Sequence, residues 1–340
     1  MELATAAGDF LIASAERLAL DTDPETIRAT LHRACGGQLN PLAADGYPAS
    51  RLTSTGVPFE ASVTGGGGRS TPALRYVTEA GTIHADFGSR LTAQLAAIDE
   101  VAELMPNNAA PAAETLRAFV AALYPDPADL PACQRFATWL GVVHRAAADR
   151  PPGLKLYGSL RAAPDALPRL CAAWPEFTGL APVTAHHEFI EPCFAAIEVD
   201  AHGALGHKVY LKARYGDIAT PMKLVRHFGD PAWEVLSELV RCGADPADLH
   251  HFPIAICRGH RDGATTFALH LGRHRGRDLT PLVRELAARH HGSTAAVDAL
   301  AGAAESTGAT WRYSVVGLGC SSGAGIDKLN VYGTPSWDDA

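Results

Sequence analysis

Lysine and tyrosine recur together in three segments of this 340-residue chain. The segments are GLKLYGSL at 153–160, GHKVYLKAR at 206–214 and IDKLNVYG at 326–333. In a β-strand successive side chains point to opposite sides, so residues two or four apart share a face. Each segment would therefore place ammonium and hydroxyl groups on one face and aliphatic groups on the other. Such a face forms a cationic pocket only if it is enclosed and does not simply meet bulk water.

The elements that carry these segments follow a repeating order. Apolar periodicity predicts helices over 3–20 and 24–35, and helical sequence then separates five predicted strand pairs from one another. Strands paired as hairpins are antiparallel, which excludes a TIM barrel. Ten antiparallel strands are near the upper size of an open twisted sheet, so closure into a barrel is reasonable. The predicted pairs are 58–65 with 73–81, 135–145 with 153–161, 193–203 with 206–214, 252–263 with 265–273, and 310–320 with 327–335.

A closed barrel under a ring of helices predicts which face of each strand is enclosed. The aliphatic face would point outward to the helices, and the polar face would line a wide lumen. An α+β sandwich whose polar strand faces touch bulk water fits the same pattern, so both architectures stay open at this point. The outward set is Leu154, Leu156, Val209, Leu211, Phe267, Leu269, Leu329 and Val331. The inward set is Lys155, Tyr157, Lys208, Tyr210, Lys212, His270, Lys328 and Tyr332.

Composition and charge narrow the class of protein. A net charge of −8 argues against non-specific nucleic-acid binding, which needs a broad basic surface. The seven cysteines are scattered without a CxxC pair, which indicates free thiols in a reducing cytoplasm. Residues 1–20 carry Glu2 and Asp9 where a signal peptide needs positive charge, and no apolar run of about 18 residues predicts a membrane span. We therefore expect a cytoplasmic protein that acts on neither nucleic acid nor membranes, which leaves small-molecule partners open.

Short motifs in order along the chain resemble the ABBA-type aromatic prenyltransferases, in particular the tryptophan dimethylallyltransferase branch. The resemblance implies an α+β fold: a ten-stranded antiparallel β-barrel built from five αββα repeats and surrounded by a ring of helices. It implies one domain over 1–340, with N-terminal helices in 1–57 packing on the barrel. The motifs are Phe59-Glu60-x-Ser62, Arg75 on the next strand, Lys155-x-Tyr157, Lys208-x-Tyr210 and a C-terminal Tyr332.

The resemblance implies transfer of a dimethylallyl group from dimethylallyl diphosphate to an indole ring. Ionisation of the donor separates a diphosphate anion from an allyl cation, so the site must stabilise both. Lysine and arginine donate charge-assisted hydrogen bonds to the anion. Tyrosine can donate to phosphate oxygens and shield the cation with its ring. The implied diphosphate-binding residues are Arg75, Lys155, Tyr157, Lys208, Tyr210, Lys212, His270, Lys328 and Tyr332.

Two residues are candidates for moving the proton that the acceptor ring loses. Glu60 would hold the indole N–H and accept a proton, and His144 at the end of the third strand would relay it. A glutamate on a strand is more often a solvated surface group, and only the five-hairpin order raises Glu60 to a catalytic candidate.

The sequence departs from the family pattern in the third and fourth hairpins. Gly206 stands where family members often carry arginine, and we expect Lys212 to compensate. The fourth hairpin offers Ala268 and His270 where the family usually has Gln-x-Tyr or Lys-x-Tyr. These departures affect the identity of the substrate more than the fold.

No motif in the sequence requires a metal or another cofactor. The histidine pairs at 186–187, 250–251 and 290–291 lack HExxH or cysteine-pair spacing, so surface or capping positions explain them better than a metal site. No DDxxD motif is present, although magnesium remains compatible with the superfamily. Two alternatives stay open: a related barrel that prenylates a peptide, a phenol or another aromatic metabolite, and a non-catalytic barrel that binds a small anion.

Overall fold

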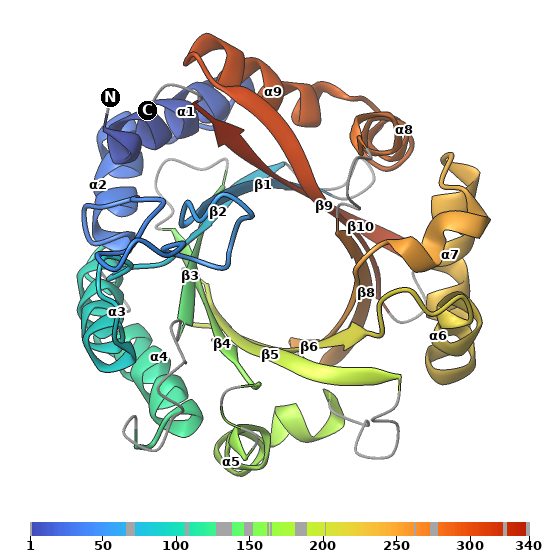
Figure 1. The fold of residues 1–340 in the computed structure, drawn as a ribbon, viewed down its shortest axis with the longest axis horizontal. Helices are drawn as coiled ribbons and strands as arrows, with labels where there is room; N and C mark the ends of the chain where they lie inside the picture. The colour runs from blue at the N-terminus through green and yellow to red at the C-terminus, as the bar shows by residue number, and fades with distance from the viewer. Residues whose placement is uncertain are drawn as a thin grey trace.

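Ten antiparallel strands close into a barrel in the computed structural model of the chain, and helices surround it (Figure 1). The structure describes residues 2–65, 72–105, 109–126, 138–145, 152–161, 163, 165–180, 189–200, 202–261, 263–272, 278–321 and 325–337. The strands are β1 (Phe59–Gly65), β2 (Ala73–Thr78), β3 (Thr138–His144), β4 (Gly153–Ser159), β5 (Ile190–Val199), β6 (Leu205–Ala213), β7 (Ile254–Arg261), β8 (Ala264–Gly272), β9 (Thr310–Ser321) and β10 (Gly325–Ser336). The helices are α1 (Leu3–Arg17), α2 (Pro24–Ala34), α3 (Phe87–Ala102), α4 (Ala109–Leu123), α5 (Ala166–Ala173), α6 (Thr220–Phe228), α7 (Asp230–Arg241), α8 (Thr280–His290) and α9 (Ala295–Ser306).

The pairing of β1 with β10 closes the barrel. Ser62 lies opposite Tyr332 and Val63 lies opposite Val331, in antiparallel register. Every other strand pair in the ring joins strands that are consecutive in the sequence. This closure confirms the predicted barrel and rules out the sandwich, because a sandwich would leave β1 and β10 as open edges.

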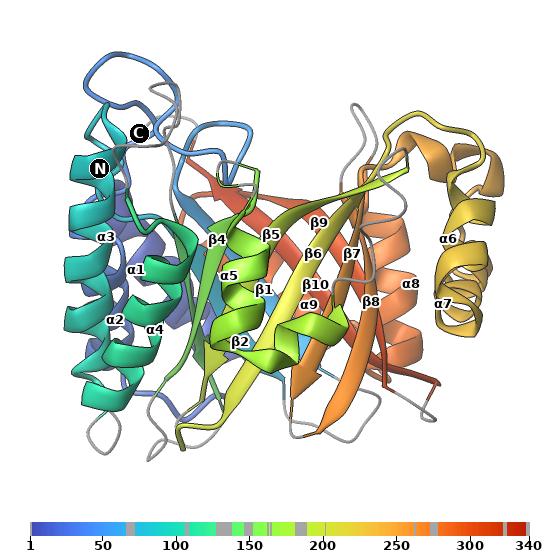
Figure 2. The same cartoon turned by 90° about the horizontal axis from the view of Figure 1, so that it is seen from below.

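The helices cover the outer face of the barrel wall (Figure 2). All eight side chains predicted to point outward are buried in the main hydrophobic core together with helix residues. Leu156 is fully buried, as are Leu211 and Leu269. Burying a side chain of this size stabilises the fold by roughly 1.5–3 kcal/mol. The helices therefore pack on the outer face of the barrel because they remove the aliphatic side chains of the strands from water.

A side-chain cap starts α2, and α1 packs on the barrel. Asp23 accepts a hydrogen bond from the backbone N–H of Thr26 at 2.8 Å and so caps α2. The ring of Phe10 on α1 lies 6.3 Å from Phe59 on β1 and 5.5 Å from Trp311 on β9. None of the described helices combines the length and apolar character that crossing a bilayer requires.

Two separate helices, α8 and α9, precede the last strand pair. Gly292 follows α8 with a φ of +74°, a conformation that residues with a Cβ rarely adopt. The chain therefore turns between α8 and α9 and does not continue as one helix.

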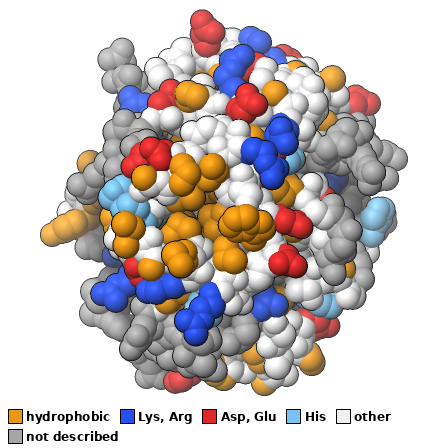
Figure 3. Space-filling view, turned by 90° about the vertical axis from the view of Figure 1, so that its right-hand side faces the viewer, with side chains coloured by type: hydrophobic (Ala, Val, Ile, Leu, Met, Phe, Trp, Pro, Cys, Tyr) orange, Lys and Arg blue, Asp and Glu red, His pale blue; other side chains and the backbone are white. Residues whose placement is uncertain are grey.

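Apolar side chains gather on the outer face over α6 and α7 (Figure 3). Met222 is 77% exposed and Trp233 is 62% exposed, and both line a surface hollow of about 750 Å³. Arg226 and Arg241 also line this hollow. It lies outside the barrel, away from the predicted lumen residues.

Candidate active site

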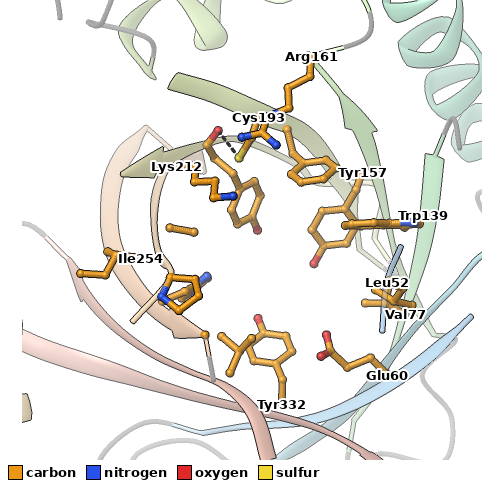
Figure 4. A pocket seen from close by; sticks show the side chains of 17 residues that line it. Leu52, Glu60, Val77, Trp139, Tyr157, Arg161, Cys193, Lys212, Ile254 and Tyr332 are labelled. Atoms are coloured by element: carbon orange, nitrogen blue, oxygen red, sulfur yellow. Dashed lines mark hydrogen bonds between the residues drawn. The ribbon is translucent and has the colours of Figure 1, made fainter. Parts of the chain in front are cut away.

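Two adjoining cavities occupy the barrel lumen. The larger has a volume of about 350 Å³, and its lining includes Glu60, Trp139 and Lys212 (Figure 4). The smaller has a volume of about 70 Å³ and is the cationic cavity, lined by Arg75, Lys155, Lys208 and Lys328 among others. Three side chains line both cavities and so mark the boundary between them; these are Tyr210, His270 and Tyr332.

Tyrosines hold the cations in the smaller cavity. Lys155 is 5% exposed, and its Nζ donates to the Tyr210 hydroxyl at 2.7 Å. The same Nζ lies 4.4 Å from the centre of the Tyr157 ring, a cation–π contact. Burial raises the pKa of Tyr157 and Tyr210 above the ordinary tyrosine value, so both phenols keep their protons. The predicted Lys-x-Tyr pairs thus meet across β4 and β6.

Arg75 enters the same cavity from β2. Its NH2 group donates to Asn330 Oδ1 at 3.0 Å, and its guanidinium carbon lies 5.4 Å from the centre of the Tyr332 ring. The Nε of Arg75 is buried and has no hydrogen-bond partner among the described residues. A buried N–H without an acceptor is costly, so this position favours a ligand that brings oxygen atoms.

The crowding of positive charge lowers the pKa of Lys328. The nearby Lys208, together with burial and the charges of Arg75 and Lys155, lowers the pKa of Lys328 to about 7. Like charges at short range disfavour the protonated form. An anion bound in the cavity would reverse this effect and hold Lys328 protonated.

Glu198 on β5 is a carboxylate within this cluster of cations that the sequence analysis did not single out. Its Oε1 accepts from Lys208 Nζ at 2.5 Å and lies 3.1 Å from Lys155 Nζ. Burial opposes ionisation, but the charges of Lys208, Lys155 and Lys328 outweigh it and hold the pKa of Glu198 well below its usual range. Strand alternation could have placed Glu198 on the lumen face of β5, because its neighbour Ile197 lies in the core, but its position opposite Lys155 depends on the β4–β5 register.

His270 separates the two cavities as an uncharged ring. Its centroid lies 6.1 Å from that of Tyr210 and 6.0 Å from that of Tyr332. A Cβ at Gly317 would lie 2.2 Å from His270 Cδ2, so glycine makes the space for the ring. Burial and the surrounding cations lower the pKa of His270 to about 3. Any contribution of His270 to anion binding is therefore that of a neutral imidazole.

Lys212 does not line the cationic cavity, so its position does not support the expectation that it compensates for Gly206. Lys212 lines the larger cavity and points into it, two positions further along β6 than Tyr210 (Figure 4). Arg261 on β7 lies opposite Gly206, and its Cδ is 3.7 Å from where a Cβ of Gly206 would lie. The guanidinium of Arg261 also lies 3.7 Å from Glu198. The arginine beside Gly206 thus comes from the neighbouring strand, which a pattern along β6 alone does not show.

Glu60 faces the larger cavity from β1 (Figure 4). Ser314 Oγ donates to Glu60 Oε1 at 2.5 Å, and burial raises the pKa of Glu60 to about 7. A register shift explains how Ser314 reaches it, because β10 pairs Tyr332 with Val315 and Gly333 with Tyr313. Ser314 is the extra residue of this β-bulge, and bulges redirect side chains. Neither the bulge nor Ser314 was predicted.

His144 does not lie in the lumen, so the expected proton relay through it is not supported by its position. Its β2 partner is Leu74, a residue of the hydrophobic core between barrel and helices. Its ring stacks on Tyr76 at a centroid distance of 5.9 Å. The lumen side chains of β3 alternate with it and include Trp139. An end-of-strand position did not reveal which face His144 takes.

An aromatic wall lines the same cavity as Glu60 and was not predicted. Trp139 on β3 lies 4.7 Å from Phe194 and 6.4 Å from Tyr157, measured between ring centroids. Glu79 accepts hydrogen bonds from Trp139 Nε1 at 3.3 Å and from Ser50 Oγ at 2.6 Å. These bonds hold the indole ring of Trp139 in place. Burial raises the pKa of Glu79 to about 7. The wall offers a flat aromatic ring a surface to stack on.

Among the described residues, no group of three or more His, Cys, Asp or Glu side chains is placed to hold a metal ion. Of the histidine pairs, His290 bonds Glu238 at 3.0 Å, and the rings of His250 and His251 lie 3.8 Å apart. The pair at 186–187 lies outside the described residues.

The closed ten-stranded barrel with its outer helices and polar lumen is the PT-barrel fold, and solved structures share it. The chain is similar to 5-dimethylallyltryptophan synthase from Streptomyces coelicolor (18% identity, 99% of this chain and 98% of that chain, TM-score 0.74). It is also similar to 6-dimethylallyltryptophan synthase from Micromonospora olivasterospora in complex with DMASPP and Trp (17%, 98% and 97%, TM-score 0.73). A third is the prenyltransferase PriB in a ternary complex with L-tryptophan and dimethylallyl thiolodiphosphate (20%, 99% and 97%, TM-score 0.71). No protein-family model and no curated protein matches the sequence.

Proposed function

We propose that the chain is a single-domain aromatic prenyltransferase that transfers a dimethylallyl group from dimethylallyl diphosphate to the indole ring of tryptophan or a related indole. The observation that carries this proposal is the pair of adjoining cavities, one cationic and one aromatic with a carboxylate. The solved structures of the same fold, whose titles name dimethylallyl donors and tryptophan, support it.

The cationic cavity suits the diphosphate of the donor. Lys155, Lys208, Lys328 and Arg75 supply charge-assisted donors that strengthen as the allylic C–O bond breaks and negative charge gathers on the leaving oxygen. Donors fixed in advance stabilise this developing charge without reorganising. The released electron pair stays on diphosphate, and the organic fragment becomes an allyl cation.

The boundary between the cavities suits the allyl cation. Tyr210 and Tyr332 present their rings there, and His270 stays neutral, so no positive side chain of the boundary repels the cation. Cation–π contact contributes roughly 2 kcal/mol when the ring is desolvated. The cation can then be attacked only from the side of the larger cavity.

The larger cavity suits the aromatic acceptor. A ring carbon attacks the allyl cation, a C–C bond forms, and the ring becomes a cation that must lose a proton. Glu60 accepts that proton, and the N–H of the indole would donate to the same carboxylate. With a pKa near 7, Glu60 is a carboxylate for much of the time at neutral pH and a stronger base than an exposed glutamate.

Two cations on the rim of the larger cavity suit an acceptor with a carboxylate. Lys212 and Arg161 both line it (Figure 4). Arg161 also pairs with Glu191. Neither Lys212 nor Arg161 lines the cationic cavity, so diphosphate bound there would leave Lys212 to a second anionic group, with Arg161 shared between that group and Glu191. An amino acid such as tryptophan carries such a group, whereas a simple phenol does not.

Incubation of the purified protein with dimethylallyl diphosphate and tryptophan tests the proposal, with and without EDTA. We expect release of diphosphate and a mass gain of one dimethylallyl group on tryptophan. Turnover with a peptide or a phenol in place of tryptophan would assign the protein to another acceptor class. Binding of diphosphate without turnover across a panel of aromatic acceptors would instead identify a non-catalytic carrier.

Lys208→Ala provides the variant control for this experiment. The substitution removes one cation of the cavity, and we expect turnover to be lost while circular dichroism and the melting profile stay those of a folded protein. Full activity in this variant would contradict the assignment of the cationic cavity to diphosphate.

A further inference from the structure

Glu198 is a negative charge in a cavity that the proposed function fills with a negative ligand. Its carboxylate is 17% exposed and lies between two ammonium groups, at 2.5 Å from Lys208 Nζ and 3.1 Å from Lys155 Nζ. Its second oxygen lies 3.7 Å from the guanidinium of Arg261. A carboxylate at this position repels diphosphate, so its presence needs an explanation.

Glu198 uses the same N–H donors that diphosphate would need. An ammonium group has three donors. Lys155 directs one to the Tyr210 hydroxyl at 2.7 Å and lies within ion-pair distance of Glu198. Lys208 directs one to Glu198. A phosphate oxygen that approached these two lysines would therefore take over donors that the carboxylate holds.

The four cations of the cavity require a counter-ion. Four cations line a space of about 70 Å³, and Lys328 already loses much of its affinity for a proton because of its neighbours. Without an anion, positive charges at this separation destabilise the folded chain. The ionised Glu198 supplies the missing negative charge from within the protein.

We propose that Glu198 is a built-in counter-ion that competes with diphosphate for Lys155 and Lys208. In the unliganded protein the carboxylate holds the two ammonium groups in place. When the donor binds, its phosphate oxygens replace the carboxylate as the acceptor of those N–H groups. After transfer, the carboxylate takes them back and so hastens departure of the product diphosphate. This inference rests on the proposed assignment of the cationic cavity to diphosphate.

Glu198→Gln tests the competition, because glutamine keeps the shape and loses the charge. The measurement is the dissociation constant of inorganic pyrophosphate by isothermal titration calorimetry, with its release rate by stopped-flow displacement. We expect the variant to bind pyrophosphate at least tenfold more tightly than the wild type and to release it correspondingly more slowly. Equal or weaker binding would overturn the proposal, because Glu198 would then act only by positioning the lysines.

Asp327→Asn is the matched control. Asp327 lines the same cavity and is exposed at its edge, and the described residues form no ion pair with it. The substitution removes the same charge from the same neighbourhood, so we expect less than a threefold change in pyrophosphate affinity. A change as large as that of Glu198→Gln would mean that net charge alone, and not competition for the two lysines, sets the affinity, which contradicts the proposal.

A second variant keeps the test informative if Glu198→Gln does not fold. Glu198→Asp retains the charge but withdraws it from the lysines by one methylene, and we expect at least threefold tighter pyrophosphate binding; unchanged or weaker binding would count against competition.

Binding to pyrophosphate does not depend on any aromatic acceptor. If the wild type binds no pyrophosphate, the proposed function and this inference both fail. If it binds but Glu198 variants do not bind more tightly, only this inference fails.

Discussion

Glu60 is a carboxyl group whose protonation changes near neutral pH. Its pKa of about 7 arises from burial, partly offset by the hydrogen bond from Ser314. The proposed base must be deprotonated to accept a proton. At saturating donor, we therefore expect kcat to rise about tenfold per pH unit below pH 7 and to level off above it. A kcat that stays flat between pH 5.5 and 8 would contradict Glu60 as the base.

Glu60→Gln separates this interpretation from a structural one. The amide can still accept the hydrogen bond from Ser314 but cannot take a proton. We expect kcat to fall by about 10²–10⁴-fold, the usual contribution of general base catalysis, and the rise with pH to disappear. Thermal melting of the variant is the control, and it should match or exceed that of the wild type, because a buried carboxylate is replaced by a neutral group.

Under the proposed function, Lys212 binds the carboxylate of an amino-acid acceptor and so distinguishes it from other aromatics. Removal of a charge-assisted hydrogen bond to a carboxylate costs about 1.5–3 kcal/mol, or roughly 10- to 150-fold in binding. We expect Lys212→Ala to raise the KM for tryptophan by at least tenfold and to leave the KM for tryptamine, which lacks the carboxylate, nearly unchanged. Steady-state kinetics with both acceptors measures this.

Lys223→Ala is the matched lysine control, because Lys223 pairs with Asp217 outside the lumen. Its kinetics should equal those of the wild type for both acceptors. A Lys212→Ala variant that loses affinity for tryptamine and tryptophan alike would show that Lys212 shapes the cavity and does not recognise a carboxylate.

At the scale of elements, the bulge between β9 and β10 connects packing to the site. A Cβ on Gly333 would lie 2.3 Å from Trp311 Cζ2 and 2.6 Å from the carbonyl oxygen of Arg312. The backbone contact cannot be relieved by a side-chain rotation. We expect Gly333→Ala to destabilise the fold by about 1–3 kcal/mol, as overpacking usually does. It should also lower kcat. The added Cβ on β10 would push Arg312 and its strand β9 outward, and β9 carries Ser314 away from Glu60.

Gly141→Ala on β3 is the control for this prediction. There the nearest atoms to an added Cβ are at 3.4 Å, an ordinary contact. Chemical denaturation should give a loss of stability clearly smaller than that of Gly333→Ala. Equal losses in the two variants would mean that the bulge has no special packing requirement.

Much of the architecture could be predicted from the sequence, because strand alternation and hairpin order are local signals. The aliphatic face of β6 (Val209, Leu211) and its polar face (Lys208, Tyr210) were assigned correctly from alternation alone. Contacts across strands were harder to predict. Arg261 beside Gly206, Glu198 beside two lysines, and Ser314 beside Glu60 all depend on register, which no single segment reveals. His144 was misplaced for a different reason: the prediction relied on its position at the end of β3, whereas alternation puts it on the outer face with Leu140 and Val142.

At the scale of the whole molecule, the positive charges in the lumen of the barrel repel one another and destabilise the folded state. The folded protein holds the pKa of Lys328 near 7, against an ordinary value of 10.5. Between those pH values the unfolded chain binds the proton and the folded chain does not, so this residue makes stability rise with pH over that window. Below pH 7 its full destabilising effect is present.

Lys328→Met removes this effect. We expect the variant to melt roughly 2–4 °C above the wild type at pH 6, with the difference shrinking towards pH 10. Differential scanning calorimetry across this range measures it. A difference that is constant with pH would show that packing, and not charge, separates the two proteins.

The pairing of β1 with β10, here called the seam, also determines when the protein becomes functional during synthesis. Glu60 and Ser314 are 254 residues apart in the chain, and Arg75 and Asn330 are 255 apart, yet both pairs are bonded across or beside this seam. A nascent chain on the ribosome can form its hairpins one after another, but the last strand must emerge before either pair can meet. Long-range closure of this kind is slow compared with local pairing. A truncated translation product would therefore lack both contacts, the one to the proposed base and the one that anchors the arginine of the cationic cavity.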